Sequence, residues 1–105
     1  MPSAIVVLTT APSLKFAKSL AGFLVQKKLA ACVSIRDGFT SYYRWKGKVE
    51  STQEALLLIK TKKNNFGKVK AVIQKKHPYQ LPEIISIPVI QGSSEYLSWL
   101  NQSLK

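Results

Sequence analysis

Residues Ala30–Thr61 read AACVSIRDGFTSYYRWKGKVESTQEALLLIKT and decide how the rest of the chain is organised. Both halves of this stretch are rich in β-branched and aromatic residues, which favour strands. Lys46-Gly47 lies between the halves and is typical of a tight hairpin turn. The pattern predicts two antiparallel strands, Ala30–Trp45 and Val49–Thr61, each about twice the usual ~5–6 residues. The first strand is expected to be interrupted at Arg36–Gly38 and then to resume.

Two elements are expected before this hairpin. Ala4–Thr10 is a continuous β-branched apolar run, the pattern of a strand buried on both faces. Ala55–Ile59, in the second hairpin strand, has the same pattern and the same expected burial. Leu14–Leu29 has apolar residues at helical spacing, and Ser13 or Thr10 is placed to cap this helix.

Three further elements are expected after the hairpin. A helix with the apolar side Phe66–Ile73 is predicted to be capped by Asn64–Asn65 and to stop at His77–Pro78. Glu83–Ile90 is predicted to be a strand, and Pro88 within it indicates a position at the edge of the sheet. A short amphipathic helix, opened by a serine, ends the chain.

The resulting order is β-α-β-β-α-β with a terminal helix, which is the split β-α-β or ferredoxin-like arrangement of the α+β class. In this topology the first and third strands are central in an antiparallel sheet. A hydrophobic content of 46% excludes intrinsic disorder, and 105 residues predict one domain spanning residues 1–105. The surface scaling law gives roughly 5,900 Å² of exposed area for a folded chain of this mass.

The charge balance indicates either an anionic partner, such as nucleic acid or a membrane surface, or simply a solvated lysine face on each helix. Sixteen Lys and Arg face five Asp and Glu, for a net charge of +11, and the lysines cluster on the two predicted helices. We expect only sequence-independent, salt-sensitive binding of nucleic acid and no specific nucleic-acid partner. An RNA-recognition module is excluded because the central runs Ile5–Leu8 and Leu56–Ile59 carry no aromatic ring to stack on bases. An acylphosphatase-like enzyme is excluded because no Gly-rich loop combines an Arg with an Asn.

Cys32 is the only thiol, which excludes intramolecular disulfides and CxxC metal or redox motifs. Because it lies between small apolar residues in a strand, we expect it to be packed in the core. No apolar run reaches the ~18–20 residues of a membrane span, so no membrane association is expected. The start of the sequence lacks a basic leader, and together these features predict a cytoplasmic protein.

Seven short motifs are spread along nearly the whole chain: Val7–Pro12, Lys28–Val33, Ser41–Glu50, Ile59–Thr61, His77–Tyr79, Pro82–Ile85, and Gly92 followed by Tyr96–Trp99. Together, and in this order, they resemble the CutA divalent-cation-tolerance family. The resemblance implies a ferredoxin-like fold assembled as a tight homotrimer, similar in architecture to PII signalling proteins, with long hairpins packed between neighbouring subunits.

The resemblance also implies a role in the response to divalent metal ions, with weak binding of Cu(II) or another divalent cation. In bacterial members, copper binding is attributed to a Cys and a pair of His residues, and the matching positions here are Thr9, Lys76 and His77. His77 is therefore the one metal ligand assigned, because imidazole suits copper and zinc; its alternative role is a structural hydrogen bond. No reaction is established for the family, so we assign no catalytic residue and expect no enzyme.

The long aromatic hairpin predicts self-association independently, because an exposed aromatic strand edge associates unless something covers it. The alternative is a hairpin that curls over its own helix. Together with the resemblance, this pattern assigns seven residues to the trimer interface or the cleft between subunits: Tyr42, Tyr43, Trp45, Glu54, Lys60, Tyr79 and Trp99. The alternative function is a PII-like trimeric sensor or scaffold that binds a small ligand or a partner protein between subunits, with no direct metal role.

Overall fold

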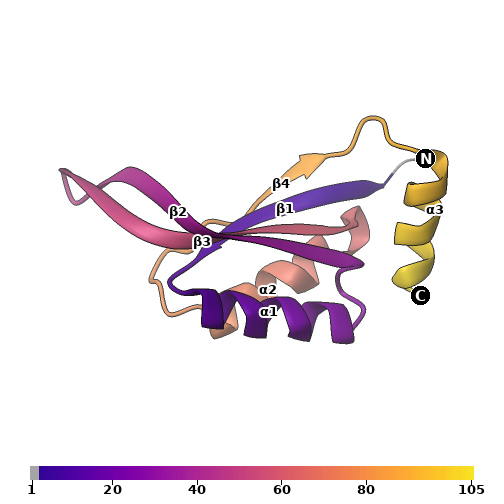
Figure 1. Cartoon of the computed structure of the whole chain (residues 1–105), viewed down its shortest axis with the longest axis horizontal. Coiled ribbons are helices and arrows are strands. Elements are labelled where there is room, and N and C mark those ends of the chain that lie inside the picture. The colour runs from indigo at the N-terminus through magenta and orange to yellow at the C-terminus, as the bar shows by residue number, and fades with distance from the viewer. Residues whose placement is uncertain (1–2) are drawn as a thin grey trace.

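The computed structural model describes residues 3–105 and has the predicted order of strands and helices, with one short 3-10 helix added. The elements are β1 (Ala4–Ala11), α1 (Leu14–Gln26), β2 (Cys32–Trp45), β3 (Lys48–Lys62), η1 (Lys63–Asn65), α2 (Phe66–Lys76), β4 (Ile85–Pro88) and α3 (Ser94–Ser103). They form the predicted ferredoxin-like α+β fold (Figure 1). No helix within the described residues is long and apolar enough to cross a membrane.

The sheet has the strand order β2-β3-β1-β4, and every neighbouring pair is antiparallel. This confirms that the first and third strands are central. Pro88 lies opposite Ile5 on the edge strand β4, as its missing N–H requires. β4 is shorter than the predicted Glu83–Ile90, because the chain leaves the sheet soon after Val89 donates its N–H to the Ala4 carbonyl.

The β2–β3 hairpin gives the molecule its elongated shape of 44 × 26 × 23 Å. Its turn is a two-residue loop in which Lys46 and Gly47 have φ angles of 51° and 79°. These positive angles are typical of a type I′ turn, which matches the twist of the flanking strands. The predicted interruption is a bulge between Arg36 and Phe39, with Gly38 at φ 70°. The strand continues beyond it.

The core lies between the sheet and the two longer helices. Figure 1 shows α1 and α2 together on one side of the sheet, and α3 at one end of it. The largest fully buried side chains come from α1, α2 and the sheet face beneath them: Leu20, Leu24, Leu57, Ile59, Ile73, Val7, Val69, Thr9 and Thr61. α3 anchors separately through Leu100 and Leu104, which cluster with Ala31.

The helix boundaries agree with the capping signals except at two points. Ser13 accepts a hydrogen bond from the Phe16 N–H and begins α1 as predicted. α1 ends at Gln26 rather than Leu29, because Lys28 takes a left-handed φ of 60° and the chain turns back. Asn65 precedes α2 but does not cap it; its amide instead donates to the hydroxyl of Thr61 and the carbonyl of Leu29.

The other face of the sheet is not covered by a helix layer. Residues paired across strands point to the same face, so the register assigns six apolar side chains to it. They are Val6, Leu8, Leu56, Leu58, Ile85 and Ile87, and we call this set the open face. Each of them is half-buried or exposed. The expectation that β1 and β3 are buried on both faces is therefore wrong for the single chain, which covers only one face.

Candidate functional site

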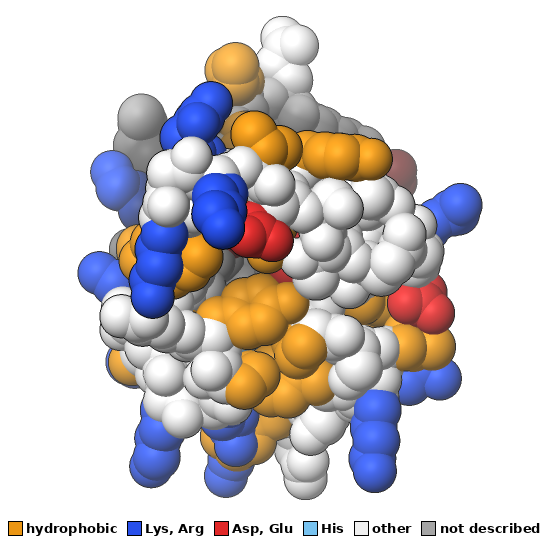
Figure 2. Space-filling model, turned by 90° about the vertical axis from the view of Figure 1, so that its left-hand side faces the viewer, with side chains coloured by type: hydrophobic (Ala, Val, Ile, Leu, Met, Phe, Trp, Pro, Cys, Tyr) orange, Lys and Arg blue, Asp and Glu red, His pale blue; other side chains and the backbone are white. Residues whose placement is uncertain are grey.

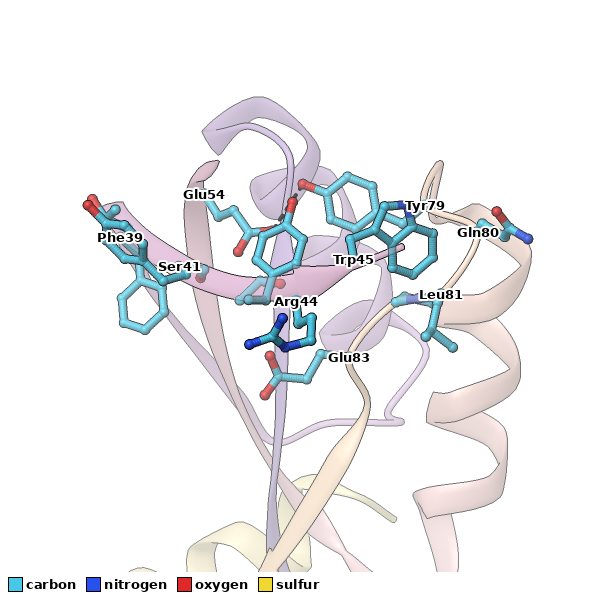
Figure 3. A pocket seen from close by; sticks show the side chains of 14 residues that line it. Phe39, Ser41, Arg44, Trp45, Glu54, Tyr79, Gln80, Leu81 and Glu83 are labelled. Atoms are coloured by element: carbon cyan, nitrogen blue, oxygen red, sulfur yellow. Dashed lines mark hydrogen bonds between the residues drawn. The ribbon is translucent and has the colours of Figure 1, made fainter. Parts of the chain in front are cut away.

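A groove of about 720 Å³ lies beside the hairpin, where β2 and β3 meet the segment that follows α2. Figure 3 shows side chains from these segments around it. The groove brings together five of the seven residues assigned to the interface or cleft: Tyr42, Tyr43, Trp45, Glu54 and Tyr79. These residues are spread from position 42 to 79 in the sequence, so the fold, and not sequence proximity, assembles them.

The other two assigned residues lie outside the groove. Lys60 lies next to the open face, where its Nζ donates to Ser34 Oγ at 2.9 Å and lies 3.9 Å from Cys32 Sγ. Cys32 is half-buried there and is not packed in the core as expected, because its strand position faces the uncovered side of the sheet. Trp99 lies on α3, half exposed, with its ring 5.5 Å from that of Tyr96.

Glu54 is the most buried charged side chain of the groove, with 7% of its surface exposed. The Tyr79 hydroxyl donates a hydrogen bond of 3.0 Å to Glu54 Oε2. Burial, followed by this hydrogen bond and by the charge of Glu54, raises the pKa of Tyr79 to about 12. The phenol therefore keeps its proton at neutral pH and acts as a fixed donor to the carboxylate.

His77 lies directly behind this pair and is also buried, with 7% exposed. Its Nε2 lies 2.7 Å from the Thr10 carbonyl oxygen, and its Nδ1 accepts the Tyr79 N–H at 3.1 Å. A carbonyl only accepts, so Nε2 carries the proton. The ring also packs against Phe16 and Tyr79, with centroids 5.3 and 4.6 Å away. Both ring nitrogens are thus engaged in holding the segment after α2 against β1.

The residues available for a metal ion are few. Residues 3–105 contain no group of three or more His, Cys, Asp or Glu side chains that could hold one. Of the two other positions implied by the family resemblance, Thr9 is fully buried, and Lys76 extends over the Phe23 ring, 4.2 Å from its centroid. These residues do not build a multidentate site within one chain, and His77 as a metal ligand stays a prediction.

The wall formed by residues 80–83 was not predicted as part of a site. Leu81 there is 73% exposed, and Figure 3 shows Glu83 and Arg44 pointing toward one another across the groove. Figure 2 views this end of the molecule and shows a hollow lined by hydrophobic side chains, with acidic and basic groups at its rim. The only sequence signal was the short motif Pro82–Ile85, which carried no chemistry of its own.

The chemistry of the groove suits an organic group better than a bare ion. Aromatic rings offer stacking surfaces, the buried Glu54 carboxylate held by Tyr79 offers a fixed acceptor, and the exposed Arg44 guanidinium offers donors. A partner side chain or a small polar molecule would meet all of these groups together.

Comparison with known proteins agrees with the architecture of the chain. Residues 5–103 match the family described as CutA1 divalent ion tolerance protein. The chain is 48% identical over 98 residues to the divalent-cation tolerance protein CutA of Thermus thermophilus, covering 93% of this chain and 95% of that protein. The structure of CutA from Xylella fastidiosa superposes with a TM-score of 0.94 at 41% identity, over 98% of this chain and 99% of that one. A protein described as the periplasmic divalent cation tolerance protein CutA of Archaeoglobus fulgidus superposes equally well, with a TM-score of 0.94 at 35% identity, over 97% of this chain and 99% of that one.

Proposed function

The chain belongs to the CutA1 divalent ion tolerance protein family, and we propose that it acts in the response to divalent metal ions as a homotrimer. We further propose that residues 1–105 work as one domain and that its role is binding, not catalysis. A binding role is supported by the groove's combination of aromatic rings with a nearly buried carboxylate.

The open face is the main observation that supports assembly into a homotrimer. β1 and β3 have the sequence pattern of strands buried on both sides, yet one side of each is left uncovered in the single chain. Ile85 and Ile87 on the adjoining edge strand are 48% and 47% exposed. A second copy that covers this face would complete the burial that the sequence encodes.

The overall dimensions support the same proposal. The chain exposes 7037 Å², about a fifth more than the scaling law gives for a compact protein of its mass. Its radius of gyration is 14.3 Å, against about 13 Å for a compact chain of this length. The excess comes from the projecting hairpin, which favours packing between subunits over curling onto its own helix.

Direct metal binding by one chain is expected to be weak. A divalent cation at either nitrogen of His77 must displace the hydrogen bond to Thr10 or to Tyr79. We therefore propose His77 as a low-affinity ligand for Cu(II) or another divalent cation. Metal affinity grows with the number of well-placed donors, and a single imidazole supplies one.

The groove supports a second candidate function, that of a PII-like sensor whose ligand is a small molecule or a partner protein between subunits. Glu54 is the residue that supports this candidate function. Its carboxylate is nearly buried and accepts one hydrogen bond, from the Tyr79 hydroxyl, and its other oxygen is directed toward the groove (Figure 3). A cationic or hydrogen-bond-donating group of a ligand would pair with this second carboxylate oxygen.

We place the protein in the cytoplasm. The support is the sequence expectation given above and the single thiol, which leaves the fold without an intramolecular disulfide that an oxidising compartment would have to form. Cell fractionation with an antibody against the untagged protein tests this placement, and recovery from the periplasm would contradict it.

Light scattering coupled to size exclusion tests the assembly. The parent chain is expected to give a trimer mass across dilution, and Ile87→Lys, which places a charge on the open face, should give a monomer. Val25→Lys is the matched control, because Val25 is similarly exposed, at 42%, but lies on α1. A monomeric parent at micromolar concentration, or equal behaviour of the two variants, would refute the proposed interface.

A further inference from the structure

The outer surface of the helix layer carries a dense set of lysines. They come from α1, from η1 and α2, and from the residue that follows α1, and all of them are exposed. They are Lys15, Lys18, Lys27, Lys63, Lys68, Lys70, Lys75 and Lys76, and we call them the lysine layer. In Figure 2, Lys and Arg side chains project from the lower margin of the molecule, the side on which α1 and α2 lie in Figure 1.

No acidic residue neutralises this layer from its own elements. The sequence contains no Asp or Glu before Asp37 and none between Ala55 and Pro82. The five acidic residues belong to the hairpin, the groove wall and α3: Asp37, Glu50, Glu54, Glu83 and Glu95. The two helices of this layer therefore carry positive charge alone, whereas the hairpin carries charges of both signs.

Two of these lysines, Lys27 and Lys76, meet at the seam between the two helices. Lys76 Nζ lies 4.2 Å from the centroid of the Phe23 ring, and Lys27 Nζ lies 5.8 Å from the same centroid. The ring of α1 thus attracts two ammonium groups, one from each side of the seam. Two like charges held near one ring repel each other, and an anion placed between them would relieve that repulsion.

We propose that the lysine layer binds the phosphate backbone of nucleic acid without sequence preference. This inference goes beyond the metal-tolerance function and does not depend on it. The backbone of a duplex carries one negative charge per ~1.7 Å, so lysines spread along two adjacent helices contact several phosphates and release their counterions. Lysine ammonium groups carry charge without the fixed geometry that base readout needs, which accounts for the lack of sequence preference.

A nucleic acid fits this surface better than a membrane or a protein partner. Val25 is the only exposed large apolar side chain that α1 and α2 contribute in the described part of the chain. A membrane-binding helix inserts an apolar face between lipids, and protein interfaces have apolar or aromatic anchors at their centre. The lysine layer offers only charge, and it faces away from the open face, so assembly through that face leaves it accessible.

Fluorescence anisotropy with a short labelled DNA duplex tests the proposal on the untagged full chain. We expect equal affinity for two duplexes of unrelated sequence. We also expect a plot of log affinity against log salt with a slope of about −0.9 per phosphate contacted. Removal of the seam charges by K27Q/K76Q should reduce affinity about tenfold at low salt and make that slope shallower by about two.

The matched control is K46Q/K48Q, which removes the same net charge from the hairpin turn. It should change affinity less than about twofold and leave the salt slope unchanged. Circular dichroism and light scattering must show both double variants folded and assembled like the parent. Equal weakening by the two pairs would overturn the proposal, because it would mean that only net charge matters. Tighter binding to phosphatidylserine vesicles than to DNA at the same salt would overturn it in favour of a membrane.

Discussion

The Tyr79 hydroxyl and the Glu54 carboxylate, 25 residues apart in the sequence, meet in a hydrogen bond of 3.0 Å. The same tyrosine donates its backbone N–H to His77, whose other ring nitrogen bonds the Thr10 carbonyl. A continuous set of hydrogen bonds therefore runs from β1 through the end of α2 to β3. It fixes the back of the groove.

Tyr79 is predicted to ionise at a higher pH than an ordinary tyrosine. Burial, followed by the hydrogen bond to Glu54, raises its pKa from 10.0 to about 12. The contribution of the neutral phenol to stability is therefore fully present below pH 10 and is lost as the pH rises through about 12. Near-ultraviolet titration of phenolate absorbance should lose its highest step in Tyr79→Phe. Tyr42→Phe, at a ring that is 76% exposed, is the control and should keep that step.

Thr9→Val is predicted to stabilise the fold. The Thr9 hydroxyl is fully buried and has no hydrogen-bond partner among residues 3–105. Replacing an unsatisfied buried hydroxyl with a methyl group of similar shape should raise the free energy of unfolding by about 1 kcal/mol. Urea denaturation measures the change, and an unchanged or lower stability would contradict the prediction.

Thr61→Val provides the opposite test at an equally buried site. The Thr61 hydroxyl donates to the Leu29 carbonyl at 2.7 Å and accepts from the Asn65 amide at 3.2 Å. The valine removes both of these bonds and leaves only the longer contact of 3.4 Å between the Asn65 amide and the Leu29 carbonyl. The free energy of unfolding should therefore fall by about 1 kcal/mol in the same urea experiment. If Thr9→Val and Thr61→Val changed the free energy of unfolding equally, the hydrogen bonds of the Thr61 hydroxyl would contribute nothing to stability, and the prediction would be wrong.

Lys46→Asn is predicted to stabilise the hairpin turn. Lys46 has a left-handed φ of 51°, a conformation that costs most residues about 1–2 kcal/mol and that Asn adopts more readily. The gain in unfolding free energy should be about 0.5 kcal/mol, measured by thermal denaturation. Gly47→Ala should destabilise the turn, because φ is 79° there and a Cβ meets strain even though nothing lies within 4 Å of it.

Trp45→Ala is predicted to weaken the assembly. The indole lines the groove near the tip of the hairpin and is 36% exposed in the single chain. Aromatic anchors at interfaces typically cost about 2 kcal/mol or more when truncated, so the trimer should dissociate at a higher protein concentration than the parent. Light scattering over a dilution series measures this shift, with Val49→Ala as the control on the facing strand.

Cu(II) binding is predicted to be weak and to disappear in His77→Ala. Calorimetry of the tag-free protein measures it, and Cys32→Ser is the control that leaves the imidazole in place. Affinity should also fall in acid, because a protonated imidazole cannot bind a metal. Tight binding that survives His77→Ala and is lost in Cys32→Ser would move the site to the thiol beside Lys60.

The sequence predicted the hairpin and the strand order because those features depend on local patterns. The continuous apolar runs, the Lys46-Gly47 pair and Pro88 at an edge each act over a few residues. The end of α1 was predicted three residues too late, because Leu29 continues the apolar spacing although it packs against the core from the loop.

The site was only partly predictable for a different reason. Candidate residues were recognised by type, but their partners come from distant segments, as in the contact between His77 and Thr10. Asn65 was expected to cap a helix, yet a carbonyl 36 residues earlier attracts its amide. Such long-range choices depend on which elements pack together, and a local pattern does not contain that information.

The central position of β1 has a consequence for how the chain is made. This strand is synthesised before the strands it pairs with: Ala4 pairs with Lys62, and Leu8 pairs with Leu58 on one side and Ile85 on the other. β2 and β3 are joined by a two-residue turn and can pair with each other as soon as both have been synthesised. The apolar β1 must wait for partners that are made much later, since distant contacts form only after the entropy of closing the intervening chain has been overcome. The nascent protein therefore passes through a stage in which its most apolar strand is unpaired, and that stage is when it most needs protection from aggregation.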